Sequence, residues 1–101
     1  MTEPARDFTL GQLRTFVAAA RARSFSRAAD QLGISQPAVS EQIAMLEGRL
    51  GHRLFIRRRG ASPVLTPDGA SLLERAEALL NASQGLRNER DVQRQRVRPR
   101  S

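Results

Sequence analysis

The sequence contains no cysteine and a single histidine, His52. Without cysteine a chain has neither a disulfide framework nor a thiolate metal site, and one histidine cannot build a metal cage with others. No stretch approaches the roughly 18 consecutive apolar residues of a membrane span, and the N-terminus lacks a basic region followed by an apolar segment. We therefore expect a cytoplasmic protein that has no metal, no cofactor and no membrane partner.

Catalytic motifs are also missing from the sequence. It shows no Gly-rich phosphate cradle, and no nucleophile, base and orienting group in a recognisable arrangement. Glu74 and Glu77 have the ordinary spacing of carboxylates on a helix surface, where a solvated pair is far more common than an acid and base pair. The chain is therefore predicted not to be an enzyme.

Lysine is absent too, so all 17 basic residues are arginine, against 10 acidic residues and a net charge of +7 over 101 residues. An excess of positive charge favours a polyanionic partner, although many soluble proteins with other partners are also basic. Position is more informative than the total, because Arg57, Arg58 and Arg59 are consecutive. The length suits one small domain.

Residues 26–51 have the pattern of two helices joined by a tight turn. Ser26 is predicted to cap a short first helix that ends at Gly33 in a left-handed conformation. Ser35 is predicted to cap the second helix, with Pro37 in its first turn, where a missing N–H costs little. One face of this second helix is apolar and consists of Val39, Ile43, Leu46 and Leu50. The opposite face, which is free to contact a partner, carries Gln36, Pro37, Ser40, Glu41 and Ala44.

An earlier helix and a hairpin are predicted on either side of this pair. Residues 1–7 are expected to be frayed, and Thr9 with Gln12 forms a capping box for a helix from about residue 10 to 21 or beyond. Phe25 is expected to fill the core and not to stack on bases. After the second helix, Leu54 and Ile56 are predicted to share one side of a short strand.

That strand is expected to pair with Val64 and Leu65 as a two-stranded wing. The turn between the strands carries Arg58, Arg59 and Gly60, so its tip is predicted to be strongly basic.

A long helix is predicted over residues 66–91, because Thr66 is a good N-cap and Pro67 suits the first helical position. Its apolar stripe consists of Leu72, Leu73, Ala76, Leu79, Leu80, Ser83 and Leu86. This stripe allows two interpretations, a helix folded onto its own domain or a surface shared with a second copy. Residues 92–101 have no apolar period and are expected to form a disordered, Arg-rich tail.

Several segments together resemble the N-terminal winged helix-turn-helix of LysR-type transcriptional regulators over about residues 8–90. They are SFSRAADQLGI, the following SQPAVS, the LE and LG that end this helix, the LF of the wing, and LTPDG. The resemblance implies a mainly α fold, with three helices and a two-stranded wing over residues 8–65. The helix over residues 66–91 would then pair antiparallel with its twin in a homodimer.

Family members usually continue into an effector-binding domain and assemble as tetramers, and no small-molecule site is expected in the present chain. The wing turn is about one residue longer and more basic than the usual family pattern.

The function predicted from these observations is sequence-specific binding of double-stranded DNA, with residues 35–50 in the major groove and a dimer on an interrupted inverted repeat. The residues expected to read bases are Gln36, Pro37, Ala38, Ser40 and Glu41. The residues expected to contact phosphates or the minor groove are Ser26, Arg27, Ser35, Arg57, Arg58 and Arg59.

Glu41 departs from the family, which more often has a basic residue after this serine. Two interpretations remain open for it: the carboxylate accepts a hydrogen bond from a cytosine amino group, or it pairs with an arginine such as Arg27.

An alternative function from another class is a winged-helix interaction module without specific DNA binding. Binding of double-stranded RNA is disfavoured, since a helix cannot enter the narrow A-form major groove.

Overall fold

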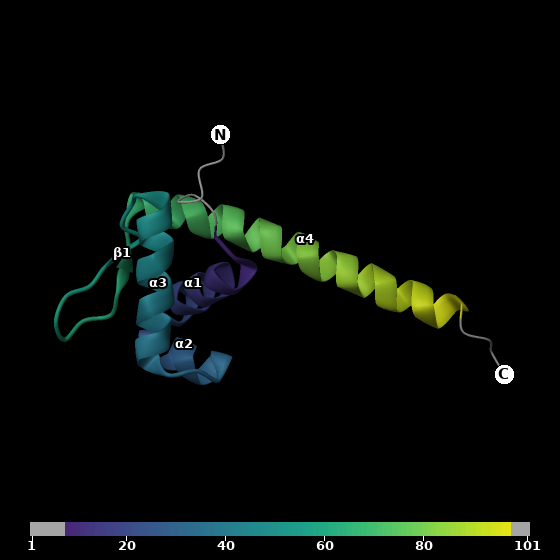
Figure 1. Ribbon diagram of the computed structural model, residues 1–101, viewed down its shortest axis with the longest axis horizontal. Helices are drawn as coiled ribbons and strands as arrows, with labels where there is room; N and C mark the ends of the chain where they lie inside the picture. Colours follow the sequence, from purple (N-terminus) through teal and green to yellow (C-terminus); the bar gives the residue numbers. More distant parts are fainter. Residues whose placement is uncertain (1–7, 98–101) are drawn as a thin grey trace.

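The computed structural model describes residues 8–97, and the side chains of residues 8–82. The elements follow in the order α1 (Leu10–Ala22), α2 (Phe25–Leu32), α3 (Gln36–Leu50), β1 (Phe55–Ile56), β2 (Val64–Leu65) and α4 (Pro67–Val97). The first three helices pack together, the two strands pair as a wing, and α4 extends away from them (Figure 1). The predicted fold class, a winged helix-turn-helix followed by a long helix, is confirmed.

The start of α1 is the capping box that the sequence predicts. The Thr9 hydroxyl accepts a hydrogen bond from the Gln12 N–H at 3.0 Å, and the Gln12 side-chain oxygen accepts from the Thr9 N–H at 3.1 Å. Leu13, Phe16 and Ala19 are then buried along one face of the helix. Their burial makes α1 the central support of the core, against which α2, α3 and the start of α4 all pack.

The start of α2 differs from the prediction, because Ser24 caps this helix and Ser26 does not. The Ser24 hydroxyl accepts from the Arg27 N–H at 3.0 Å, and Phe25 is the first helical residue. Both serines are chemically able to cap. The earlier start takes Phe25 into the helix and buries it to 4% exposure, which no local capping rule anticipates. The predicted end at Gly33 is confirmed, with φ of 71°.

The predicted anchoring of α3 is confirmed. The Ser35 hydroxyl accepts from the Ala38 N–H at 3.2 Å, and Pro37 lies in the first turn. Val39, Ile43 and Leu46 are buried on the inner face. A contact that the sequence did not indicate adds to this packing: the buried Thr15 hydroxyl of α1 lies 2.5 Å from the Gln42 side-chain oxygen of α3. This hydrogen bond holds α3 in one rotation on α1.

The wing has the predicted strands, with Phe55 opposite Leu65 and Ile56 opposite Val64 in antiparallel register. The prediction that Leu54 and Ile56 share one side of the strand is wrong. Leu54 lies before the paired segment and is buried, as is Phe55, whereas Ile56 is 47% exposed. A strand of two residues is too short for its alternation to include Leu54.

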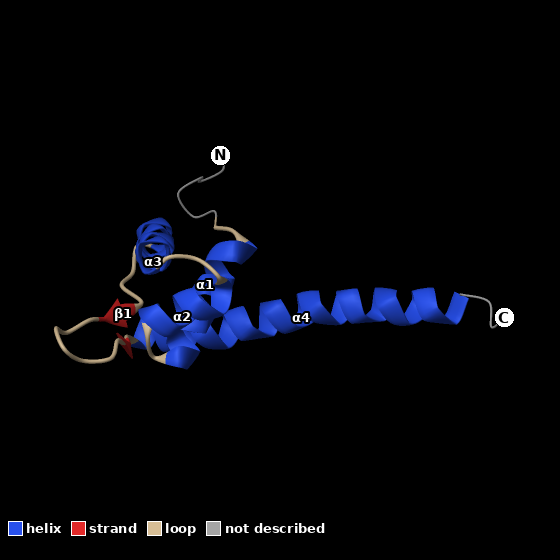
Figure 2. Ribbon diagram, turned by 90° about the horizontal axis from the view of Figure 1, so that it is seen from below, coloured by secondary structure: helices blue, strands red, loops and turns tan. Residues whose placement is uncertain are grey.

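The wing is attached to α3 through a carboxylate. Glu47 accepts hydrogen bonds from the N–H of Leu54 at 2.7 Å and from that of Phe55 at 3.3 Å, and its side chain is only 17% exposed. Two backbone donors that would otherwise lack a partner are thereby satisfied. Phe55 in turn contacts Phe16 and Phe25, with ring centroids 5.5 and 5.3 Å away. The wing therefore begins from a rigid base, at the end of the molecule opposite the free end of α4 (Figure 2).

The first turns of α4 pack against the domain. The Thr66 hydroxyl accepts from the Gly69 N–H at 2.9 Å, which confirms the predicted cap. Ala76 is buried to 2% exposure, and the Arg21 guanidinium of α1 bonds Glu77 at 2.6 Å from its Nε. Here the interpretation of a helix folded onto its own domain holds for Ala76, which was predicted as part of the dimer interface. The short side chain of Ala76 allows α1 and α4 to approach closely.

Beyond these turns α4 continues as an extended helix (Figure 1). Its 31 residues correspond to a length of about 46 Å. The radius of gyration is 16.7 Å, against about 13 Å for a compact chain of this size. The predicted boundary at residue 91 is wrong, since the helix runs to Val97 and takes in the first part of the expected tail. Residues 1–7 and 98–101, on which the two terminal predictions also fall, lie outside the described residues.

Candidate nucleic-acid interface

The outer face of α3 presents the residues predicted to read bases. Gln36, Pro37 and Glu41 are exposed, and Ala38 and Ser40 are half-buried between them. On the opposite side of the helix, Val39 and Ile43 are buried in the core. The helix therefore cannot rotate without exposing apolar surface, and its polar face is held in a fixed direction.

Hydroxyl and arginine side chains stand beside the starts of α2 and α3. Ser26 and Arg27 are exposed in the first turn of α2, and Ser35 is exposed before α3. Because Ser24 provides the cap, the hydroxyl of Ser26 is not required for that task. Backbone N–H groups and hydroxyls at helix starts are suited to anionic oxygens. These positions are consistent with the predicted phosphate contacts, which stay predictions.

Arg57 is held in place by an aromatic ring. Its guanidinium carbon lies 4.1 Å from the centroid of the Phe25 ring, a cation–π contact. Phe25 was predicted to be a core residue, and its burial confirms this, but the sequence did not indicate its second role as a platform for Arg57. Arg58 and Arg59 follow in the exposed turn, which reaches Gly60 at φ of 77°. The three arginines thus differ in how they are held: Arg57 packs on an aromatic ring at the base of the wing, whereas Arg58 and Arg59 lie in its exposed turn.

A cleft of about 360 Å³ separates the wing from the helix-turn-helix. We call it the wing cleft; it is lined by residues 23–26, Gln36, Arg57 and residues 60–63. Two arginines, Arg23 and Arg57, are among the residues that line it, and no aspartate or glutamate is. The cleft therefore lies between the start of α3 and the basic wing, and the charged residues that line it are both positive.

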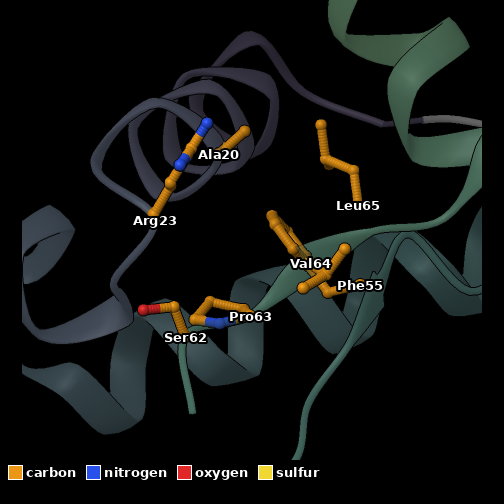
Figure 3. A pocket seen from close by; sticks show the side chains of 7 residues that line it. All are labelled: Ala20, Arg23, Phe55, Ser62, Pro63, Val64 and Leu65. Atoms are coloured by element: carbon orange, nitrogen blue, oxygen red, sulfur yellow. The ribbon is translucent and has the colours of Figure 1, made fainter.

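A second pocket, of about 440 Å³, lies behind the wing. Arg23 and Ala20 form one side of it, and Phe55, Val64 and Leu65 form the other (Figure 3). Arg23 lines both hollows, and it was not among the predicted site residues. Its only sequence signal is a position between two predicted helices, which does not distinguish it from other exposed arginines.

Glu41 is exposed on the reading face. Within the part of the chain that the structure describes, its carboxylate forms no ion pair, so the contact considered with Arg27 is absent. An unpaired carboxylate on this surface would repel the phosphates of a bound duplex. The cytosine-reading interpretation of Glu41 stays a prediction.

The predicted dimer stripe divides along its length. Leu72 and Leu73 are half-buried against the core, and Ala76 is fully buried there. Leu79, by contrast, is 48% exposed. Leu80 is half-buried, and the side chains of Ser83 and Leu86 lie outside the described residues. Among the stripe residues whose side chains are described, Leu79 is therefore the one most accessible to a partner.

Two further features limit the kinds of site present in the described residues. Among the side chains of residues 8–82 there is no group of three or more histidines, aspartates and glutamates that could hold a metal ion. His52 instead pairs with Asp68, with Nδ1 and Oδ2 3.3 Å apart, which joins the segment after α3 to the first turn of α4. None of the helices described here combines the length and apolar character needed to cross a membrane.

Comparison with known proteins places this geometry in a family. Residues 10–70 match the model of the bacterial regulatory helix-turn-helix proteins of the lysR family. The HTH-type transcriptional regulator AbaB of Streptomyces antibioticus is 53% identical over 74 residues, covering 72% of this chain and 24% of AbaB. The chain spans 24 to 30% of the length of the first two curated relatives it matches.

Two solved structures of DNA complexes are similar over most of the chain. The BenM DNA-binding domain in complex with the catB site 1 DNA has 37% identity and a TM-score of 0.75, and covers 84% of this chain and 96% of its own. The CbnR DNA-binding domain in complex with DNA has 32% identity and a TM-score of 0.76, and covers 90% of this chain and all of its own. This chain belongs to the LysR family of bacterial regulatory helix-turn-helix proteins, and residues 10–70 form its helix-turn-helix domain.

Proposed function

We propose that this chain is the DNA-binding part of a transcriptional regulator and that it recognises a specific sequence in double-stranded DNA. The observation that carries the proposal is the outer face of α3, where exposed Gln36, Pro37 and Glu41 stand over a buried anchoring face, beside an Arg-rich wing. An α-helix presented in this way fits the major groove of B-DNA. The similarity to two domains solved on DNA supports it.

The contacts divide into reading and positioning. The amide of Gln36 and the carboxylate of Glu41 match hydrogen-bonding groups on base edges, Pro37 and Ala38 suit a thymine methyl, and Ser40 reaches a base or phosphate. The residues proposed to hold phosphates or enter the minor groove are Ser26, Arg27, Ser35, Arg57, Arg58 and Arg59. Contacts of the second kind strengthen binding to any duplex and do not select a sequence.

A homodimer is proposed to form through α4. Leu79 is a large apolar side chain left exposed on a helix that projects from its domain, and the predicted stripe continues beyond it to Ser83 and Leu86. Antiparallel pairing of two such helices would bury this surface and place two reading helices on one face of the duplex. The interface is proposed to begin near Leu79, because Ala76 is already buried within the protomer.

The remaining proposals concern the whole protein. Its relatives are transcriptional regulators, and we propose that this chain likewise acts without catalysis and in the cytoplasm. In a longer parent chain, an effector-binding domain would follow α4 and tetramers would form. The described residues contain no site that we assign to a small-molecule effector.

Selection of binding sites from random DNA duplexes with the purified chain tests the proposal. The expected result is an interrupted inverted repeat whose half-sites are about one helical turn, roughly 34 Å, or a small multiple of it apart. Competition with duplex RNA should leave binding intact. Recovery of no preferred sequence, together with binding that hardly changes with salt, would instead identify an interaction module.

A further inference from the structure

The turn between α1 and α2 places an arginine in an unfavourable backbone conformation. Arg23 has φ of 54° and ψ of 33°, in the left-handed region, and it is the only non-glycine residue with positive φ in the described part of the chain. An L-residue in this region clashes with its own backbone, which glycine avoids. A glycine at this position would therefore close the turn with less strain.

No side-chain hydrogen bond or ion pair within the described fold compensates for this conformation. Arg23 is exposed, and among the described residues its side chain has neither a hydrogen bond nor an ion pair. By contrast, Arg21, two residues earlier, is engaged with Glu77. A strained residue that makes no stabilising internal contact is a candidate for a functional contact with another molecule.

The position of Arg23 indicates which kind of molecule its side chain would contact. Arg23 lines the wing cleft together with Gln36 of the reading helix and with Arg57, whose guanidinium is fixed on Phe25. The other polar groups of the cleft are serine hydroxyls, and no carboxylate lines it. Two arginines and three serines line this one hollow, and arginine side chains and hydroxyls are suited to the oxygen atoms of a phosphate, which a guanidinium binds in bidentate geometry.

We infer that the wing cleft holds a backbone phosphate of the bound duplex, and that Arg23, in the α1–α2 turn, is a second cation for this phosphate in addition to Arg57. This inference rests on the proposed function, and it adds a phosphate contact that belongs to neither the recognition helix nor the wing. On this inference, the left-handed conformation of Arg23 serves to direct an arginine at the duplex.

The test compares three substitutions of one residue by fluorescence anisotropy on the selected duplex over a range of salt concentrations. Arg23→Gly and Arg23→Ala should each weaken binding roughly fivefold and lower the log–log salt slope by about one unit. Arg23→Lys should restore the slope, because it keeps the charge. As a matched control, Arg14→Ala removes an exposed arginine from α1 that lines neither hollow, and it should leave the slope unchanged.

Thermal unfolding separates this role from a structural one. Arg23→Gly relieves the left-handed strain, so its Tm should equal or exceed that of the unmodified chain while its DNA binding is weaker. If Arg23→Gly binds with unchanged affinity and salt slope, or if its only effect is a lower Tm, Arg23 serves the end of α1 and the inference is wrong. If the unmodified chain binds no duplex DNA, the proposed function fails as well.

Discussion

Glu41 is the one acidic residue among those proposed to read bases. Near phosphates a carboxylate weakens binding to any duplex unless it accepts a hydrogen bond, for which the cytosine amino group is the matching donor. Glu41→Ala should therefore erase one cytosine preference in each half-site, about 1 to 3 kcal/mol at that position, and tighten binding to unrelated DNA. Site selection with both proteins measures this change.

The matched control for Glu41 is Glu74→Ala, which removes an exposed carboxylate from α4 and alters the net charge equally. It should leave the selected sequence unchanged. A profile that is identical for Glu41→Ala and the unmodified chain would show that Glu41 reads no base.

Gly69 shows how a single hydrogen atom permits the contact between α4 and the wing. A Cβ added there would lie 2.2 Å from the Leu54 carbonyl oxygen and 3.0 Å from a methyl group of Leu65. Gly69→Ala should therefore lower the free energy of unfolding by about 1 to 3 kcal/mol, because α4 must shift away from the wing. Denaturant unfolding gives this quantity directly.

Gly48 on α3 provides the comparison, since a Cβ there meets nothing within 4 Å. Gly48→Ala should raise the free energy of unfolding by about 0.5 to 1 kcal/mol through helix propensity. Equal effects of the two substitutions would contradict the close approach at Gly69.

The wing is the element whose contribution to binding should be independent of sequence. Changing Arg57, Arg58 and Arg59 together to alanine should weaken binding to every duplex and reduce the log–log salt slope by about one unit for each lost phosphate contact. The preference at the centre of each half-site should survive, because α3 is anchored separately by its buried face. Binding titrations at several salt concentrations report both effects.

The arginines can be separated within this element. Arg57 is held on the Phe25 ring, whereas Arg58 and Arg59 lie in the exposed turn. A pre-positioned side chain loses less conformational freedom on binding, so Arg57→Ala should weaken binding more than Arg58→Ala. An unchanged slope for the triple variant would mean that the wing does not touch DNA.

At the scale of the whole molecule, α4 carries the proposed dimer interface. Leu79→Asp places a charge on the exposed apolar surface and should give a monomer that binds DNA weakly, since two linked half-site contacts are reduced to one. Light scattering measures the mass of each form. Ala78→Asp, an exposed position that turns to the other side of the same helix, is the control and should remain dimeric. A monomeric unmodified chain, both free and on DNA, would refute the proposed interface.

Much of the fold could be predicted because its signals are local. The capping box of Thr9 and Gln12, the caps at Ser35 and Thr66, and the left-handed Gly33 all act between residues within one turn. The apolar period of α3 likewise identified its buried and exposed faces from its own residues. The outward direction of the α3 face that carries Gln36, Pro37 and Glu41 was predictable for the same reason, because burying one face of a helix exposes the opposite face.

Where the local sequence allowed two equally good arrangements, packing between elements in the tertiary structure determined which one formed. Ser24 and Ser26 can both cap a helix, and burial of Phe25 selected Ser24. The apolar stripe of α4 suits either its own domain or a partner, and packing on α1 took Ala76 and left Leu79 exposed. Arg57 contacts the ring of Phe25, and Arg23 lines the same cleft as residues 60–63 of the wing. Both arrangements bring together residues that are distant in the chain. Such contacts depend on packing between elements, which acts through space and leaves no period in the sequence.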